Sequence, residues 1–228
     1  MSTRKFTFAL GEFYHLYNRG VDKRTIYLNP DDHKRFVELL FLVNSSKSLD
    51  FRTVREEVVS VFDFDCGEPL VAIGAYCLMP NHFHILATPL VEHGLTTFMN
   101  KLGTSYSMFF NKKYKRTGAL FQGKFKAEHA NTDEYLKYLY AYIHLNPVKL
   151  IDKDWKEQGS KDAAKSFNFA ASFQYSSLSD YLGQKRDETK ILDPKPFPEY
   201  FLTPPDIKNE LFEWLTYNEI DNAVNIIH

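Results

Sequence analysis

The order of apolar and polar positions predicts seven elements of secondary structure in the first 150 residues. Residues 13–18 are mostly aromatic or apolar and end at the turn formed by Arg19-Gly20, so they predict a strand. Residues 31–44 carry apolar side chains at helical spacing and predict an amphipathic helix. Two short apolar runs, 70–78 and 82–88, lie on either side of Pro80-Asn81 and predict a hairpin.

The remaining elements follow from the same reasoning. A second helix is expected after Gly94 to about residue 111, and an extended basic fourth strand over 120–130. A third helix over 132–145 has Asn131 as its predicted N-cap and ends before Pro147. Strand, helix, strand, strand, helix, strand is the ferredoxin-like split β-α-β order. We therefore predict an α+β fold, an antiparallel sheet with its helices on one face.

The domain organisation follows from where this pattern weakens. We predict one domain over residues 1–150, with an insertion at about 45–69, and a helical, proline-rich C-terminal extension over 151–228. Within the extension, residues 173–183 predict a short packed helix, 193–205 an extended arm with five prolines, and 206–228 a terminal helix.

Composition restricts the class of protein further. The net charge of −1 argues against indiscriminate binding of nucleic acid, but seven basic residues and no acid lie between Lys101 and Lys126. Cys66 and Cys77 form no Cys-x-x-Cys pattern, so neither a disulfide framework nor a zinc ribbon is indicated. No apolar run approaches membrane length, and we expect a soluble cytoplasmic protein.

The hairpin carries the first candidate chemistry. His82 and His84 are two apart on a strand, so both imidazoles project from the same face. Two convergent imidazoles are half of a metal site. A pair of partly buried histidines with ordinary hydrogen-bond partners is the alternative, and the pair alone does not decide between them.

The third helix supplies the rest. Tyr135, Tyr138, Tyr142 and Asn146 fall on one helix face, where an aromatic core stripe is the alternative to a site. A cation held by His82, His84 and the Asn146 carbonyl oxygen would lie beside the Tyr142 hydroxyl. Tyrosine, with a pKa of about 10, is a poor nucleophile unless the electrophile is activated, as a divalent cation activates a phosphodiester. The product would be a covalent phosphotyrosine.

Four ordered motifs resemble those of the single-tyrosine HUH transposases, in particular the REP-associated tyrosine transposase branch. They are YHLYNRG (14–20), LMPNHFHIL (78–86), RTGALFQGKF (116–125) and YIHLNPV (142–148). The segment from Ser176-Ser177 to Tyr181-Leu182-Gly183 matches as well, so the resemblance spans roughly residues 10–183. The insertion and the acidic, proline-rich C-terminal part depart from the family pattern, which leaves the DNA specificity open.

This resemblance implies a ferredoxin-like catalytic domain that cleaves and rejoins single-stranded or hairpin DNA, leaving a 5′-phosphotyrosine and a free 3′-hydroxyl. It implies Tyr142 as the nucleophile, His82, His84 and Asn146 as metal ligands, and Mg²⁺ or Mn²⁺ as cofactor. Tyr138, one turn earlier, is the reserve nucleophile. Some relatives form homodimers and others act alone, so the oligomeric state stays open.

The predicted DNA contacts follow from charge and aromatic character. We expect a phosphate track and one stacking ring, formed by Arg19, Lys112, Lys113, Lys115, Arg116, Phe121, Lys124 and Lys126. His15, His129 and His144 are assigned structural roles. The main alternative function is a domesticated hairpin-DNA-binding protein without strand transfer. A plasmid replication or transfer endonuclease and a metal hydrolase using Glu128 fit less well.

Overall fold

The computed structural model describes residues 7–47 and 51–216. Four strands form one antiparallel sheet: β1 (Tyr14–Arg19), β2 (Val71–Met79), β3 (His82–Pro89) and β4 (Lys126–His129). Their order is β2-β3-β1-β4. This is the order of a ferredoxin-like sheet, and the predicted fold class is confirmed.

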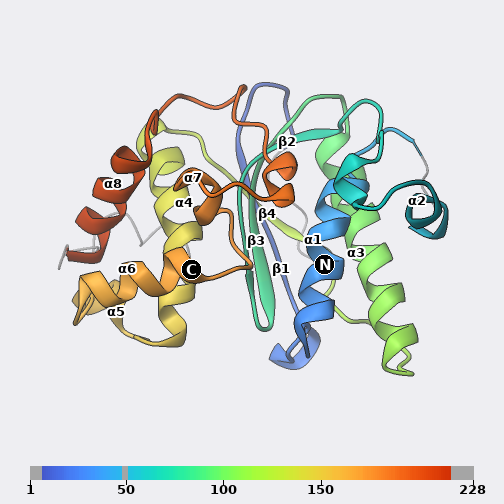
Figure 1. The fold of residues 1–228 in the computed structure, drawn as a ribbon, viewed down its shortest axis with the longest axis horizontal. Coiled ribbons are helices and arrows are strands. Elements are labelled where there is room, and N and C mark those ends of the chain that lie inside the picture. Colours follow the sequence, from blue (N-terminus) through green and yellow to red (C-terminus); the bar gives the residue numbers. More distant parts are fainter. Residues whose placement is uncertain (1–6, 48–50, 217–228) are drawn as a thin grey trace.

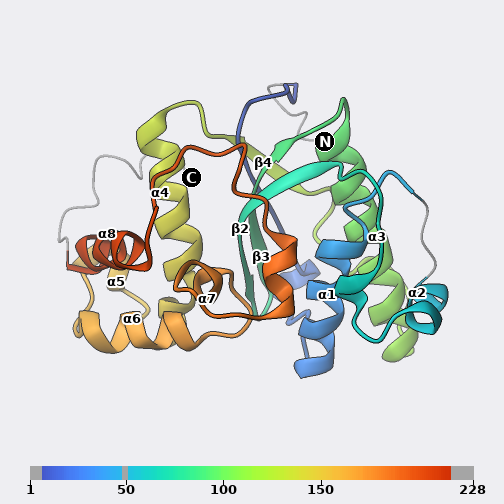
Figure 2. The same ribbon diagram turned by 45° about the horizontal axis from the view of Figure 1, so that its top comes forward.

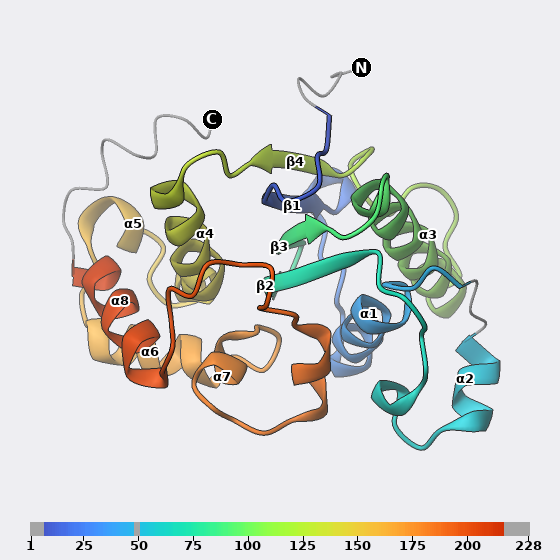
Figure 3. The same cartoon turned by 90° about the horizontal axis from the view of Figure 1, so that it is seen from above.

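Helices cover both faces of this sheet (Figures 1 and 3). Helices α1 (Pro30–Leu42) and α3 (Gly94–Lys113) pack on one face, as predicted, while the third predicted helix, α4 (Asp133–Leu145), covers the other. Side-chain alternation along β3 explains the arrangement: Phe83 and Ile85 belong to the core under α1 and α3, and Leu86 belongs to the core under α4. The two histidines of β3 therefore lie on the α4 side.

The register of the strands brings polar side chains together beneath α4. In the central strand β1, Tyr17 is paired with His84 of β3, and His15 is paired with Glu128 of β4. Because alternate residues share a face, His15 and Tyr17 point to the same side as the β3 histidines. Three neighbouring strands thus present polar groups to the C-terminal half of one helix.

Two local predictions were wrong in detail. The fourth strand covers only 126–129 rather than 120–130, because the chain bends at Gly118 and Gly123, whose φ values of 85° and 80° are left-handed. Among the described residues, one isolated bridge, Gly20 to Phe121, continues the pairing. Helix α4 is capped by Thr132, whose side chain accepts a hydrogen bond from the Tyr135 N–H at 3.1 Å, and not by Asn131.

The predicted insertion at 45–69 contains α2 (Phe51–Glu57) and the 3₁₀ turn η2 (Val61–Asp63). Its buried side chains, among them Val54, Val61 and Phe62, join the core that α1 and α3 form. A further 3₁₀ turn, η1 (Val21–Lys23), follows β1. Cys66 and Cys77 are both free and buried.

The C-terminal extension packs against the outer face of α4 (Figures 1 and 2). The 3₁₀ turn η3 (Asn146–Leu150) connects α4 to it, and it consists of α5 (Trp155–Gln158), α6 (Ala163–Ser172), α7 (Leu178–Tyr181), η4 (Asp187–Ile191) and α8 (Pro204–Thr216). Apolar side chains of α4, η3 and the extension form one shared core. The predicted terminal helix corresponds to α8, and residues 217–228 lie outside the described residues.

The extension also covers one edge of the sheet. The Leu78 N–H donates to the Tyr175 carbonyl at 2.9 Å, and the Ser177 N–H donates to the Tyr76 carbonyl at 3.0 Å. Further along, the Asp193 N–H donates to the Ile73 carbonyl at 3.0 Å. The outer edge of β2 is therefore hydrogen-bonded to the extension, which satisfies backbone groups that an edge strand would otherwise leave bare.

Candidate active site

The two histidines of β3 lie beneath the C-terminal end of α4. His84 is 5% exposed, and the ring centroids of His82 and His84 are 4.9 Å apart with the planes almost perpendicular. The Nδ1 atom of His82 lies 2.6 Å from the Asn81 side-chain oxygen, which leaves Nε2 to face the site. The predicted convergence of the two imidazoles is present.

Helix α4 places Tyr142 and Asn146 over these rings. The Tyr142 ring stands edge-on to the rings of His84, at 5.2 Å between centroids, and of His15, at 5.6 Å. Asn146 is 1% exposed and lies beside His82 and the Tyr142 hydroxyl. The four residues predicted to form the site, from a hairpin and a helix sixty residues away, meet at one place.

The reserve nucleophile Tyr138 has different surroundings. Its ring packs on Trp214 of α8 at 5.0 Å between centroids, and on Tyr142 at 5.8 Å. No ring contact between Tyr138 and the β3 histidines is found in the described part of the chain. Tyr142 is therefore the tyrosine of the stripe that stands beside the histidines.

Two buried polar atoms at the centre of the site have no hydrogen-bond partner among the described residues: His84 Nε2 and Asn146 Oδ1. Leaving such atoms unpaired costs about 1–3 kcal/mol each, so they usually have a ligand or water. A nitrogen and an oxygen lone pair are ligands that divalent cations accept, and the residues present therefore fit a bound cation. Asn146 is the candidate third ligand, because its unpaired side-chain oxygen is buried and the residue lies beside His82.

The electrostatics of the site favour neutral imidazoles. Burial, with contributions from Arg19 and Lys149, lowers the pKa of His82 to about 4, and burial together with His15 lowers the pKa of His84 well below its usual value. Both rings therefore keep free lone pairs at neutral pH. Burial raises the pKa of Tyr142, and the Asn146 amide counteracts part of this rise.

Two residues to which we gave other roles from the sequence, His15 as structural and Glu128 as the base of a less favoured hydrolase, lie beside the site. The Nε2 atom of His15 lies 2.8 Å from Nδ1 of His84, and Nδ1 of His15 lies 3.7 Å from the Glu128 carboxylate. Glu128 also accepts hydrogen bonds from the hydroxyls of Tyr17, at 2.7 Å, and Tyr135, at 3.1 Å. Strand alternation places His15 and Tyr17 on one face, and that signal was available in the sequence.

Lys156 of α5 is a third residue beside the site. Its Nζ lies 3.6 Å from the centroid of the Tyr142 ring, and burial, with Lys149 nearby, lowers the pKa of its amine to about 6. The sequence carries no signal for this contact, because the residue lies in a short helix between the motif that ends at residue 148 and the matching segment that begins at Ser176.

The residues predicted to bind DNA fall into two groups. Arg19 is exposed at the end of β1, opposite His82 in the strand pairing, and Lys126 is exposed on β4. Lys112 and Lys115 are exposed at the C-terminal end of α3, while Arg116 binds the Asn111 side chain at 3.2 Å and Lys124 is exposed in the loop before β4. DNA binding by all of them stays a prediction.

Lys113 and Phe121 have structural partners. Lys113 forms an ion pair at 2.7 Å with Asp32, which is fully buried and also accepts from the Tyr114 hydroxyl at 2.7 Å. The Phe121 ring is 8% exposed and packs against Phe83 and Tyr106. Stacking of a base on Phe121 would require the ring to leave this core.

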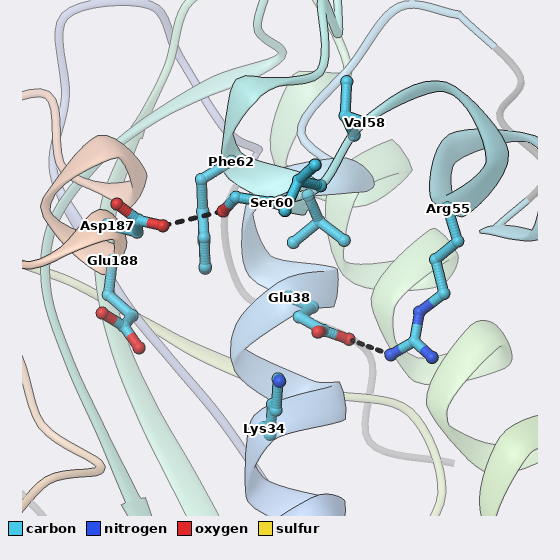
Figure 4. Close-up of a pocket in the computed structure, with 10 residues that line it drawn as sticks. Lys34, Glu38, Arg55, Val58, Ser60, Phe62, Asp187 and Glu188 are labelled. Atoms are coloured by element: carbon cyan, nitrogen blue, oxygen red, sulfur yellow. Dashed lines mark hydrogen bonds and ion pairs between the residues drawn. The ribbon is translucent and has the colours of Figure 1, made fainter.

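A surface pocket of about 550 Å³ lies away from these residues (Figure 4). It is lined by α1, the segment after α2 and η4, and contains the Glu38–Arg55 ion pair and a hydrogen bond from Ser60 to Asp187. Because α1 packs on the sheet face opposite α4, this pocket is separate from the candidate site. None of the helices described is long and apolar enough to cross a membrane.

A ferredoxin-like sheet with a strand-borne histidine pair facing a helix-borne tyrosine and amide defines the single-tyrosine class that the sequence motifs indicated. A family model described as "Transposase IS200 like" matches residues 34–146, which includes both histidines, the tyrosine and the amide. The chain belongs to this family, as its motifs predicted. A comparison with curated proteins found no match.

Among solved structures, the chain is similar to a REP-associated tyrosine transposase bound to a REP hairpin. The TM-score is 0.49 and the sequence identity 13%, over 82% of this chain and 90% of that chain.

Proposed function

We propose that the protein is a metal-dependent transposase that cleaves and rejoins single-stranded DNA through a covalent 5′-phosphotyrosine on Tyr142. The observation that carries the proposal is the convergence of His84 Nε2, Asn146 Oδ1 and the Tyr142 ring, with both ligand atoms buried and unpaired among the described residues. Membership of the transposase family supports the same reaction class.

Each residue has a distinct part in this reaction. His82, His84 and Asn146 would hold Mg²⁺ or Mn²⁺, which when bound would withdraw charge from a phosphodiester oxygen and orient the group. The Tyr142 oxygen attacks phosphorus, the bond to the 3′ oxygen breaks, and the 3′-hydroxyl leaves with a proton. Rejoining is the same exchange in reverse.

The substrate proposed is single-stranded DNA with a hairpin. Arg19 is exposed and is paired with His82 in the sheet, and it would contact a phosphate beside the site. Lys126, on the next strand, would extend this contact along the backbone. A cytoplasmic location and homodimer formation remain predictions.

The test is adduct formation. The protein is incubated with a panel of hairpin-bearing single strands and Mn²⁺ or Mg²⁺, and a denaturing gel is read for a protein–DNA band. We expect a band that disappears with chelator and with Tyr142→Phe. Tyr138→Phe is the matched control, because it removes the same hydroxyl one turn away and should leave the band. If only Tyr138→Phe lost the band, the nucleophile would be Tyr138 and the assignment of Tyr142 would be wrong.

The alternative function has its own signature in this assay. A domesticated hairpin-binding protein would retard the same oligonucleotides on a native gel and yield no covalent band with either metal. The buried, unpaired ligand atoms favour the enzyme over this alternative, because a protein that only binds DNA has no need of them.

A further inference from the structure

The polar groups beneath α4 form a chain that leads from a carboxylate to the candidate metal ligand. Glu128 lies 3.7 Å from His15 Nδ1, and His15 Nε2 lies 2.8 Å from His84 Nδ1. His15 Nδ1 has no closer partner among the described residues, and the His84 nitrogen on the far side of the ring, Nε2, is the unpaired atom at the site. The chain joins the three neighbouring strands β4, β1 and β3.

We infer that Glu128 and His15 are positioning residues that fix the tautomer and orientation of His84, so that its Nε2 lone pair faces the cation. This inference rests on the proposed function, because it assigns a role toward the same metal. It extends the site beyond the ligands themselves to two residues on strands β1 and β4.

The charge of Glu128 determines which nitrogen of His15, and in turn which nitrogen of His84, carries the proton. The Glu128 carboxylate lies 3.7 Å from His15 Nδ1, which is too far for a hydrogen bond, but its negative charge favours a proton on that nitrogen over a bare lone pair. With that proton placed, Nε2 of a neutral His15 is an acceptor, and the proton between the two rings belongs to Nδ1 of His84. His84 Nε2 then carries no proton and has its lone pair free for a metal. The reverse order would put a proton on His84 Nε2 and prevent it from binding a cation.

Glu128 is itself held in place from two sides. The Tyr17 and Tyr135 hydroxyls both donate to it, and its contacts with His15 and these tyrosines outweigh the effect of burial and lower its pKa. It therefore stays an acceptor at neutral pH. His15 is 3% exposed and stacks on His84 at 5.0 Å between centroids, so neither ring can turn freely.

The test measures the metal and the proton on the DNA-free protein. Mn²⁺ affinity is measured by titration, and ¹⁵N chemical shifts report which His84 nitrogen is protonated. We expect parent His84 to be protonated on Nδ1 in the metal-free protein. His15→Leu should lose this preference and weaken Mn²⁺ binding about 10- to 100-fold. His15→Gln, whose amide can accept from His84 and donate to Glu128, should restore most of the affinity.

Two further variants make the test specific. Glu128→Gln should reduce the tautomer preference, since its amide can also donate to His15. Tyr17→Phe is the matched control, because it removes a donor to Glu128 but leaves the His15 contact, and it should change Mn²⁺ affinity less than 2-fold.

The outcomes separate the inference from the proposed function. Parent His84 protonated on Nε2, or His15→Leu binding Mn²⁺ like the parent, overturns the inference even if the tyrosine–DNA adduct forms. The expected tautomer and Mn²⁺ affinities without any adduct would support the inference while the proposed strand transfer fails.

Discussion

The amine of Lys156 gives the most direct quantitative prediction, because burying it over the Tyr142 ring lowers the stability of the folded protein. Burial lowers its pKa from 10.5 to about 6 in the folded protein. The folded chain therefore binds fewer protons than the unfolded chain at pH 7. Linkage assigns about 5 kcal/mol of destabilisation at pH 7 to a shift of this size. Because the side chain keeps part of its solvent contact, we expect about 2 kcal/mol.

The perturbation is Lys156→Met, which keeps an unbranched side chain and removes the amine. The variant should be more stable than the parent at pH 7. The parent should gain stability between pH 7 and pH 9, as the penalty for losing the proton shrinks, and the variant should lack this gain. The assay is denaturant unfolding followed by circular dichroism at pH 7, 8 and 9. Lys153→Met, at an exposed lysine of the same segment, is the control and should follow the parent.

The refuting results are clear. A variant that is less stable than the parent at pH 7 would mean that the amine stabilises the fold through its contact with the Tyr142 ring. If stability changed with pH in the same way in parent and variant, the pKa of the Lys156 amine would not be lowered in the folded state. Either result would remove the argument that this lysine is retained at the expense of stability.

The remaining predictions concern other buried polar groups. Ser177→Ala should destabilise the fold by about 1–3 kcal/mol in thermal unfolding, because it leaves a buried imidazole of α4 and a β2 amide without their partner. Ser179→Ala, whose hydroxyl is buried without a partner among the described residues, should be close to neutral. Lys113→Ala should destabilise the fold by about 3 kcal/mol, because it leaves the buried Asp32 carboxylate without its ion-pair partner. Lys112→Ala should leave stability unchanged. It should reduce the salt dependence of DNA binding by about one charge, measured by titration at several salt concentrations.

Local patterns predicted the hairpin and the long helices, since periodicity and turn residues act within a few positions. The site residues His82, His84, Tyr142 and Asn146 were placed together correctly by the motifs that carry them. The covering of both faces of the sheet by helices was not predicted from periodicity, because β2 is apolar along its whole length and shows no alternation.

The other misses have equally physical causes. The left-handed φ at Gly123 shortens β4, and a sequence shows the glycine but not the bend. His15 and Glu128 act through the pairing of β1 with its two neighbours, a non-local contact that no short motif contains. Lys156 reaches Tyr142 through the packing of the extension, for which the chain offers no periodic signal.

The backbone hydrogen bonds between β2 and the extension limit how two copies of the protein could form a dimer. Fusing two sheets side by side through β2 requires bare amides and carbonyls on that strand, and residues 175–177 and 193 already occupy them. A dimer formed through the outer edge of β2 would first have to displace the extension and expose the apolar outer face of α4. Truncating the chain at residue 150 would expose both the edge of β2 and the apolar face of α4. Such a fragment should therefore aggregate rather than fold as an independent domain.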